Sequence, residues 1–236
     1  MFLRKFLLLP VIALTVISFA SCSDDDENNM VTPPASTSTS KVKVVHTSPD
    51  APKVDILLDN AFVDTLSFPR NTSYLEVNSG SRNVKVRATG TTIVPIDANL
   101  TLDVNKNYSI FAIDRLSNIS PLVTVDDLST PASGKAHVRF IHLSPDAPAV
   151  NIIANGSVTL FSNRSFNKTI TAAEQAFTPV DAGTYNLQVR TSAGNVLALD
   201  LPGITLTAGK IYTVFAKGFL SGTGAQALGA QIIVNN

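Results

Sequence analysis

The sequence predicts an all-β protein built from two tandem antiparallel β-sandwich domains of immunoglobulin-like or transthyretin-like type. A short phrase, His46–Pro52, returns as His142–Pro148, and apolar runs flank both copies. Polar and apolar residues alternate in short runs such as 84–88, the pattern of half-buried strands. Turn residues interrupt these runs frequently, and no long stretch has helical periodicity. A repeated module of short strands therefore predicts two copies of one sandwich.

The landmarks of the two copies follow one another in the same order. Residues 108–113 are apolar on both faces, which predicts a central strand, and 212–216 is its counterpart. The distance in sequence between matching residues is larger near the end of the two copies than near their start. This difference predicts an insertion within residues 162–175 of the second copy. Thr171–Gln175 is expected to form a brief helical turn there.

One corner of the fold should differ between the copies. Tyr185 follows the turn at Gly183 and enters a strand, a position from which a tyrosine hydroxyl often anchors a sandwich corner. The first copy has Arg82 at the equivalent place, so we expect it to lack this anchor.

The N-terminal segment predicts export and lipidation. A basic start and an apolar run, too short for a transmembrane helix, indicate a signal peptide over residues 1–21. Cys22, the only cysteine, follows small residues in a pattern that resembles a bacterial lipobox, so we interpret it as the site of acylation, for example with palmitate. The acidic residues 24–27 resemble the surface-export signal of Bacteroidota-type lipoproteins, and residues 22–40 are polar enough to form a flexible tether.

The rest of the chain divides into domains at 41–128 and 135–236. The short linker 129–134 should hold the domains close together, with an end-to-end arrangement as one option. The pair Asp126-Asp127 at the end of the first domain is expected to be solvated. Eighteen basic residues balance eighteen acidic ones, and no basic cluster stands out. The sequence therefore excludes nucleic-acid binding by a basic face.

The repeated phrase supplies the candidate site residues: His46 with Asp50, and His142 with Asp146. Imidazole and carboxylate groups can bind a metal ion or share a proton. Each copy offers only these two groups locally, whereas a metal site needs three or four protein ligands. We therefore assign no metal, no cofactor and no catalytic residue.

A structural role for the phrase is the interpretation that we favour. Ser48 and Ser144 do not lie in a Gly-x-Ser-x-Gly elbow, so they do not indicate a nucleophile. Ser-Pro-Asp-Ala instead fits a type I turn, and the second proline forces a bend before the next strand. The imidazole could fix this corner by bonding a carbonyl or the aspartate. A corner that also contacts a ligand is the alternative. Separately, Asp64-Thr65-Leu66 resembles an O-glycosylation acceptor, with Thr65 as the modified residue.

The phrase, together with Val54-Asp55-Ile56 and the segment 183–190, resembles the family called domain of unknown function 4397. The resemblance covers nearly all of residues 41–236. It implies exported, largely bacterial β-sandwich modules that often occur in tandem, and it brings no established catalytic residues.

These observations predict a cell-envelope lipoprotein, anchored in the outer membrane through Cys22 and exposed at the cell surface. We expect a non-enzymatic role in binding, adhesion or structure, with a glycan or an envelope protein as partner. The alternative is a hydrolase, or an accessory subunit of one, that acts on an extracellular polymer.

Overall fold

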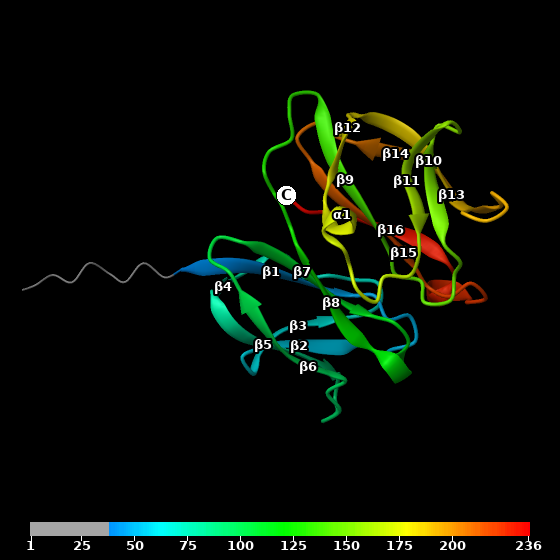
Figure 1. The fold of residues 1–236 in the computed structure, drawn as a ribbon. Helices are drawn as coiled ribbons and strands as arrows, with labels where there is room; N and C mark the ends of the chain where they lie inside the picture. Colours follow the sequence, from blue (N-terminus) through cyan, green and yellow to red (C-terminus); the bar gives the residue numbers. More distant parts are fainter. Residues whose placement is uncertain (1–37) are drawn as a thin grey trace, which may run out of the picture. The chain divides into compact units, whose positions relative to one another are not determined.

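The computed structural model describes residues 38–236, and nearly all of its regular structure is β-strand, as predicted (Figure 1). The predicted signal peptide, Cys22 and most of the tether lie outside the described residues. Within residues 38–236, no helix is long and apolar enough to cross a membrane.

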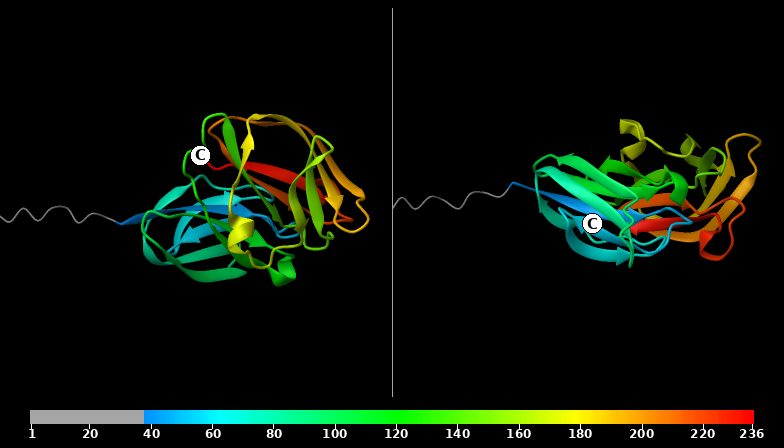
Figure 2. Two further views of the ribbon diagram at one scale, coloured as in Figure 1. Left: turned by 45° about the horizontal axis from the view of Figure 1, so that its top comes forward. Right: turned by 90° about the horizontal axis from the view of Figure 1, so that it is seen from below.

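The first copy is a sandwich of two four-stranded sheets, ordered β4-β1-β7-β8 and β3-β2-β5-β6 (Figures 1 and 2). All neighbours are antiparallel except β1 and β7, which run parallel. The elements are β1 (Thr39–His46), β2 (Val54–Leu58), β3 (Ala61–Leu66), β4 (Leu75–Asn78), β5 (Gly80–Ala88), β6 (Ile96–Leu102), β7 (Asn107–Ile113), the 3₁₀ helix η1 (Leu116–Asn118) and β8 (Ser120–Val125).

The second copy repeats this topology, with sheets β12-β9-β15-β16 and β11-β10-β13-β14 and a parallel β9–β15 pair. The prediction of two tandem sandwiches is confirmed, with one parallel strand pair in each. The elements are β9 (Lys135–His142), β10 (Val150–Ala154), β11 (Val158–Arg164), α1 (Ala172–Gln175), β12 (Thr178–Asp181), β13 (Gly183–Thr191), β14 (Leu197–Leu206), β15 (Ile211–Lys217), the 3₁₀ helix η2 (Gly224–Gln226) and β16 (Gly229–Val234).

The predicted insertion lies mainly in the connection from β11 to β12. Residues 165–177 form this connection, whereas the shorter segment 67–74 joins β3 to β4 in the first copy. The expected helical turn is α1. The backbone N–H of Glu174 donates to the Thr171 hydroxyl, and the Glu174 carboxylate accepts from the Thr171 backbone N–H, so a reciprocal capping box fixes the first turn.

The predicted tyrosine corner is also present in the second sandwich. Tyr185 Oη donates to the carbonyl oxygen of Asp181 at 2.7 Å. In the first sandwich, Arg82 forms an ion pair with Asp59 at 2.9 Å instead. Tyr185 joins β13 to the end of β12, whereas Arg82 joins β5 to the turn after β2, so Arg82 does not replace the tyrosine anchor.

The two sandwiches share a third core in addition to their own. The strand alternation sends one set of residues into each sandwich, for example Ile110 and Ala112 from β7. The opposite set, including Phe111 and Ile113, packs with residues of the second copy in one buried cluster: Val45, Phe111, Ile113, Leu122, Ile141, Leu143, Phe215 and Ile233. These residues belong largely to the sheets β4-β1-β7-β8 and β12-β9-β15-β16, so the copies pack through sheet faces. The option of an end-to-end arrangement was wrong.

Equivalent positions meet across this interface. Phe111 and Phe215, which occupy matching places in β7 and β15, make an edge-to-face contact with ring centroids 6.3 Å apart. On each side a cation lies over an aromatic ring of its own copy: Lys43 over Tyr74 at 4.2 Å, and Arg139 over Phe177 at 4.5 Å. The interface therefore has the repeated contacts of an approximate two-fold dimer, formed within one chain.

One buried ion pair joins the copies. Asp126 Oδ1 lies 2.7 Å from Arg139 Nη1, and both side chains are 0% exposed. Asp126 also accepts hydrogen bonds from three hydroxyls: Tyr74 and Ser109 at 2.5 Å each, and Thr124 at 2.9 Å. The expectation of a solvated acidic pair was wrong for Asp126. This residue follows β8 directly and is buried against Arg139 of β9, at the interface of the two copies. The expectation holds for Asp127, which is exposed.

Removing the carboxylate of this pair tests the interface. Asp126→Ala leaves the Arg139 guanidinium buried without its counter-ion, so we expect the free energy of unfolding to fall by about 3–5 kcal/mol. The matched control is Asp181→Ala, which breaks the exposed pair with Lys135 at 2.7 Å and should cost less than about 1 kcal/mol. Urea unfolding monitored by tyrosine fluorescence measures both, and equal effects would contradict the role of the pair.

Candidate functional site

Both imidazoles of the repeated phrase bond a backbone carbonyl within the phrase. His46 Nε2 lies 2.9 Å from the carbonyl oxygen of Pro52, and His142 Nε2 lies 3.1 Å from that of Pro148. A carbonyl only accepts, so Nε2 carries the proton in both. Both histidines are buried. The imidazole therefore fixes the bend after the Ser-Pro-Asp-Ala turn, as the structural interpretation predicted.

The aspartates of the phrase bond a neighbouring loop instead of the histidines. Asp50 accepts from the backbone N–H of Leu116 at 2.8 Å, and Asp146 accepts from that of Leu220 at 2.9 Å. These loops follow β7 and β15, so each carboxylate ties its phrase to the strand that pairs with β1 or β9. Asp146 also forms an ion pair with Arg115 of the first copy at 3.2 Å.

Two hydroxyls of the phrase are engaged in the same way. Thr47 Oγ1 donates to the Ala112 carbonyl at 2.8 Å, and Ser144 Oγ donates to the Gly218 carbonyl at 2.7 Å. Among residues 38–236, no group of three or more His, Cys, Asp or Glu side chains could hold a metal ion. Most polar groups of the phrase thus bond backbone atoms of the fold, whereas Ser48 Oγ and the Nδ1 atoms of His46 and His142 are buried without a hydrogen-bond partner in this part of the chain.

Burial shapes the protonation of both histidines. Desolvation lowers the pKa of His46 and of His142 below 6.5, and the hydrogen bond to the proline carbonyl offsets part of this effect. Both imidazoles are therefore neutral at pH 7.

The predicted glycosylation residue lies on strand β3 and is exposed. The Thr65 hydroxyl donates to Asp55 Oδ1 at 2.9 Å, and Asp55 also pairs with Arg87 at 2.9 Å. Glycosylation of Thr65 stays a prediction, since no observation tests it.

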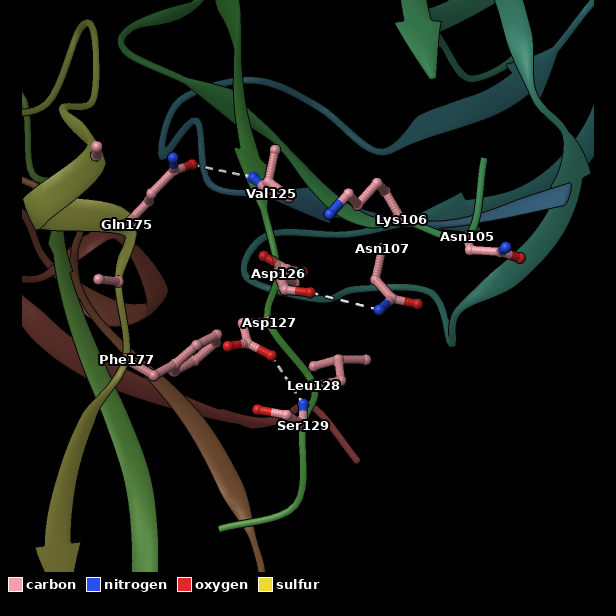
Figure 3. A pocket seen from close by; sticks show the side chains of 12 residues that line it. Asn105, Lys106, Asn107, Val125, Asp126, Asp127, Leu128, Ser129, Gln175 and Phe177 are labelled. Carbon is pink, nitrogen blue, oxygen red and sulfur yellow. Dashed lines mark hydrogen bonds between the residues drawn. The ribbon is translucent and has the colours of Figure 1, made fainter. Parts of the chain in front are cut away.

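A separate cleft of about 580 Å³ opens where the two copies meet, beside the buried ion pair (Figure 3). Three segments line it. They are the turn before β7, the chain that leaves β8 and the α1 segment, with lining residues Asn105, Lys106, Asn107, Val125, Asp126, Asp127, Leu128, Ser129, Ala172, Gln175, Ala176 and Phe177.

Hydrogen bonds hold the walls of the cleft together. Gln175 Oε1 accepts from the backbone N–H of Val125 at 3.0 Å, which ties α1 to the end of β8. Asn107 Nδ2 donates to the backbone carbonyl of Asp126 at 3.4 Å, on the floor. The backbone N–H of Ser129 donates to Asp127 at 2.9 Å and lowers the pKa of that carboxyl, which is therefore ionised at neutral pH.

Comparison with known protein families shows to which family the chain belongs. The family described as Domain of unknown function (DUF4397) matches the chain twice, over residues 40–153 and 145–236. The chain belongs to this family. The resemblance seen in the repeated phrase is thereby confirmed, and the chain holds two copies of the family's domain. No curated protein matches the chain.

Sequence reasoning missed the interface cluster and the cleft. One signal was available: Lys43 and Arg139 occupy equivalent places in β1 and β9, on the strand face that also carries Val45 and Ile141. A cation repeated on an apolar face predicts a buried partner. The lining of the cleft comes from three distant segments, and no local motif marks it.

The pH dependence of stability tests the role of the histidines. The unfolded chain takes up protons on its imidazoles below about pH 6.5, whereas the folded chain resists protonation, so the unfolded state binds more protons. The free energy of unfolding should therefore fall as the pH drops from 7 to about 5. The double variant His46→Gln/His142→Gln should lose most of this slope, and the control His137→Gln, at a partly exposed position, should keep it. Equal slopes in wild type and double variant, measured by urea unfolding, would contradict this.

Proposed function

We propose that the chain is a lipid-anchored cell-envelope protein whose two sandwiches serve a non-enzymatic binding or structural role. The observation that carries this proposal is the use of the repeated polar phrase. Its imidazoles, its carboxylates and two of its hydroxyls bond backbone groups of the fold, at the distances given above. These hydrogen bonds favour a structural role for the phrase over a catalytic one. The sandwiches would then bind a partner through their loops and clefts.

The anchor rests on the N-terminal sequence. A signal-like segment ends at Cys22, and an acidic cluster and a polar stretch follow. Acyl chains on Cys22 would hold the protein in the outer membrane, and the segment 22–40 would separate the sandwiches from the lipid surface. The acidic cluster favours display on the outer face of the cell.

A glycan or another envelope protein is the partner class that we favour. The folded part is near charge balance, which favours neutral or mixed partners over polyanions. The alternative of a hydrolase has less support. Glycoside hydrolysis commonly uses two carboxylates flanking the scissile bond, whereas one of the two carboxylates at the cleft, Asp126, is committed to the ion pair with Arg139.

The test compares the full chain with its Cys22→Ala variant in the native host. Wild type should incorporate labelled palmitate, sediment with outer membranes and be degraded by protease added to intact cells. The variant should lose the label and leave the membrane fraction. Palmitate label that persists in the variant would refute the anchor.

A second readout addresses the binding role. The purified full chain in detergent is incubated with native envelope polysaccharide, and both retention and newly formed reducing ends are measured. We expect retention of the polysaccharide without turnover. Reducing ends that accumulate above those of a heat-denatured sample would replace the binding role with the hydrolase alternative.

A further inference from the structure

We propose that the cleft beside the Asp126–Arg139 pair is a binding site for one or two units of a neutral saccharide. This inference rests on the proposed binding function, and it names the site and the ligand class. It follows from the position of the cleft, the polar groups that line it, its aromatic wall and its charge.

The cleft lies where the two copies cease to match. One wall is the segment 172–177 in the connection between β11 and β12; the first copy has a shorter connection there and no helix. The opposite wall is the chain 125–129, which leaves β8 toward the second copy. The segment that carries α1 therefore gives this cleft a wall that the first copy lacks.

The walls present hydrogen-bonding groups that suit hydroxyls. Gln175 uses Oε1 to accept from Val125, which leaves its amide NH₂ group, and Asn107 uses Nδ2 to donate to the Asp126 carbonyl, which leaves its side-chain oxygen. Asp127 adds an ionised carboxylate, and Asn105 adds a second amide. Vicinal sugar hydroxyls both donate and accept, so they match a mixed set of amides and a carboxylate.

Phe177 supplies an apolar surface among these polar groups. The guanidinium of Arg139 lies over its ring at 4.5 Å and holds the ring in place. The ring is half-buried, lines the cleft and is directed toward Asp127 in Figure 3. An aromatic ring beside a carboxylate and amides accommodates the C–H face of a sugar while its hydroxyls bond the polar groups.

Charge and size narrow the ligand class. The cleft has one exposed cation, Lys106, and one exposed anion, Asp127. Hydrogen bonds from Ser129 lower the pKa of the Asp127 carboxyl most, and His137 and Lys106 add to this shift. This balance disfavours phosphate groups and polyanions. A volume of about 580 Å³ suits a small ligand, and the fixed walls require little rearrangement on binding.

The experiment uses the full chain in detergent and five disaccharides: maltose, cellobiose, xylobiose, mannobiose and chitobiose. Saturation-transfer NMR identifies binders, and calorimetry measures their affinity. We expect at least one to bind, and Asp127→Ala to weaken it about tenfold or more, as expected when a charge-assisted hydrogen bond is lost. Asp200→Ala removes an exposed carboxylate from β14 and is the matched control, expected to bind like wild type.

Phe177→Ala is the second variant, with Phe62→Ala on exposed strand β3 as its control. Because Phe177 packs on Arg139, its effect is interpreted only with an unchanged circular-dichroism spectrum, whereas Asp127→Ala stands by itself.

The outcomes separate this inference from the proposed function. A disaccharide that binds both Asp127→Ala and wild type equally would overturn the cleft and leave the binding function in place. Binding of none of the five, while native polysaccharide is retained, would also overturn the saccharide cleft alone. If an unstructured peptide binds and none of the five disaccharides does, the cleft would be reassigned to a protein partner. Turnover of a bound disaccharide would overturn the non-enzymatic function and leave the cleft.

Discussion

The buried pair of Asp126 and Arg139 is the interaction on which the arrangement of the two sandwiches depends. Each charge would be costly to bury alone, so the pair requires both copies to be in place. Three hydroxyls complete the shell of Asp126, and Thr213 accepts from Arg139 Nε at 2.9 Å. The apolar cluster around the pair provides most of the attraction between the sheets, and the pair specifies how they align.

The approximate two-fold character of this interface explains how one repeated sequence can build it. Lys43 and Arg139 occupy equivalent strand positions, as do Ser109 and Thr213. Yet the copies have diverged at the buried pair: Asp126 accepts from Arg139, whereas Lys43 Nζ donates to the carbonyl of Val234 at 3.2 Å. Burial lowers the pKa of Lys43 to about 8, although Asp126 opposes this shift. One side of the interface thus holds the strong ion pair and the other a weaker contact.

The proposed binding site lies where the two copies differ. The repeated phrase gives each sandwich the same corner, with an imidazole on a proline carbonyl and a carboxylate on the loop after the parallel strand. The insertion that carries α1 breaks this equivalence and walls the cleft beside the pair. The repeat therefore supplies a rigid frame, and the inserted segment supplies the surface proposed to bind a ligand.

Local patterns predicted much of this fold. The alternation of polar and apolar residues, as in 42–46, and the turn-forming residues between such runs predicted the strands. The change in sequence distance between matching residues of the two copies located the insertion and α1. The hydroxyl of Tyr185 and the corner role of His46 also follow from short-range rules. The packing of sheet against sheet does not. A two-layer sandwich covers one face of a strand, and the second apolar face of 108–113 does not indicate which surface covers it. The fate of Asp126 and the cleft depend on segments far apart in the chain, which no local pattern joins.

Differential scanning calorimetry of the chain tests most directly whether the two sandwiches form one cooperative unit. A shared core and a buried ion pair predict a single transition, with a calorimetric enthalpy equal to the van't Hoff enthalpy. Two resolved transitions, or a calorimetric enthalpy near twice the van't Hoff value, would show that the sandwiches unfold independently and would contradict the account.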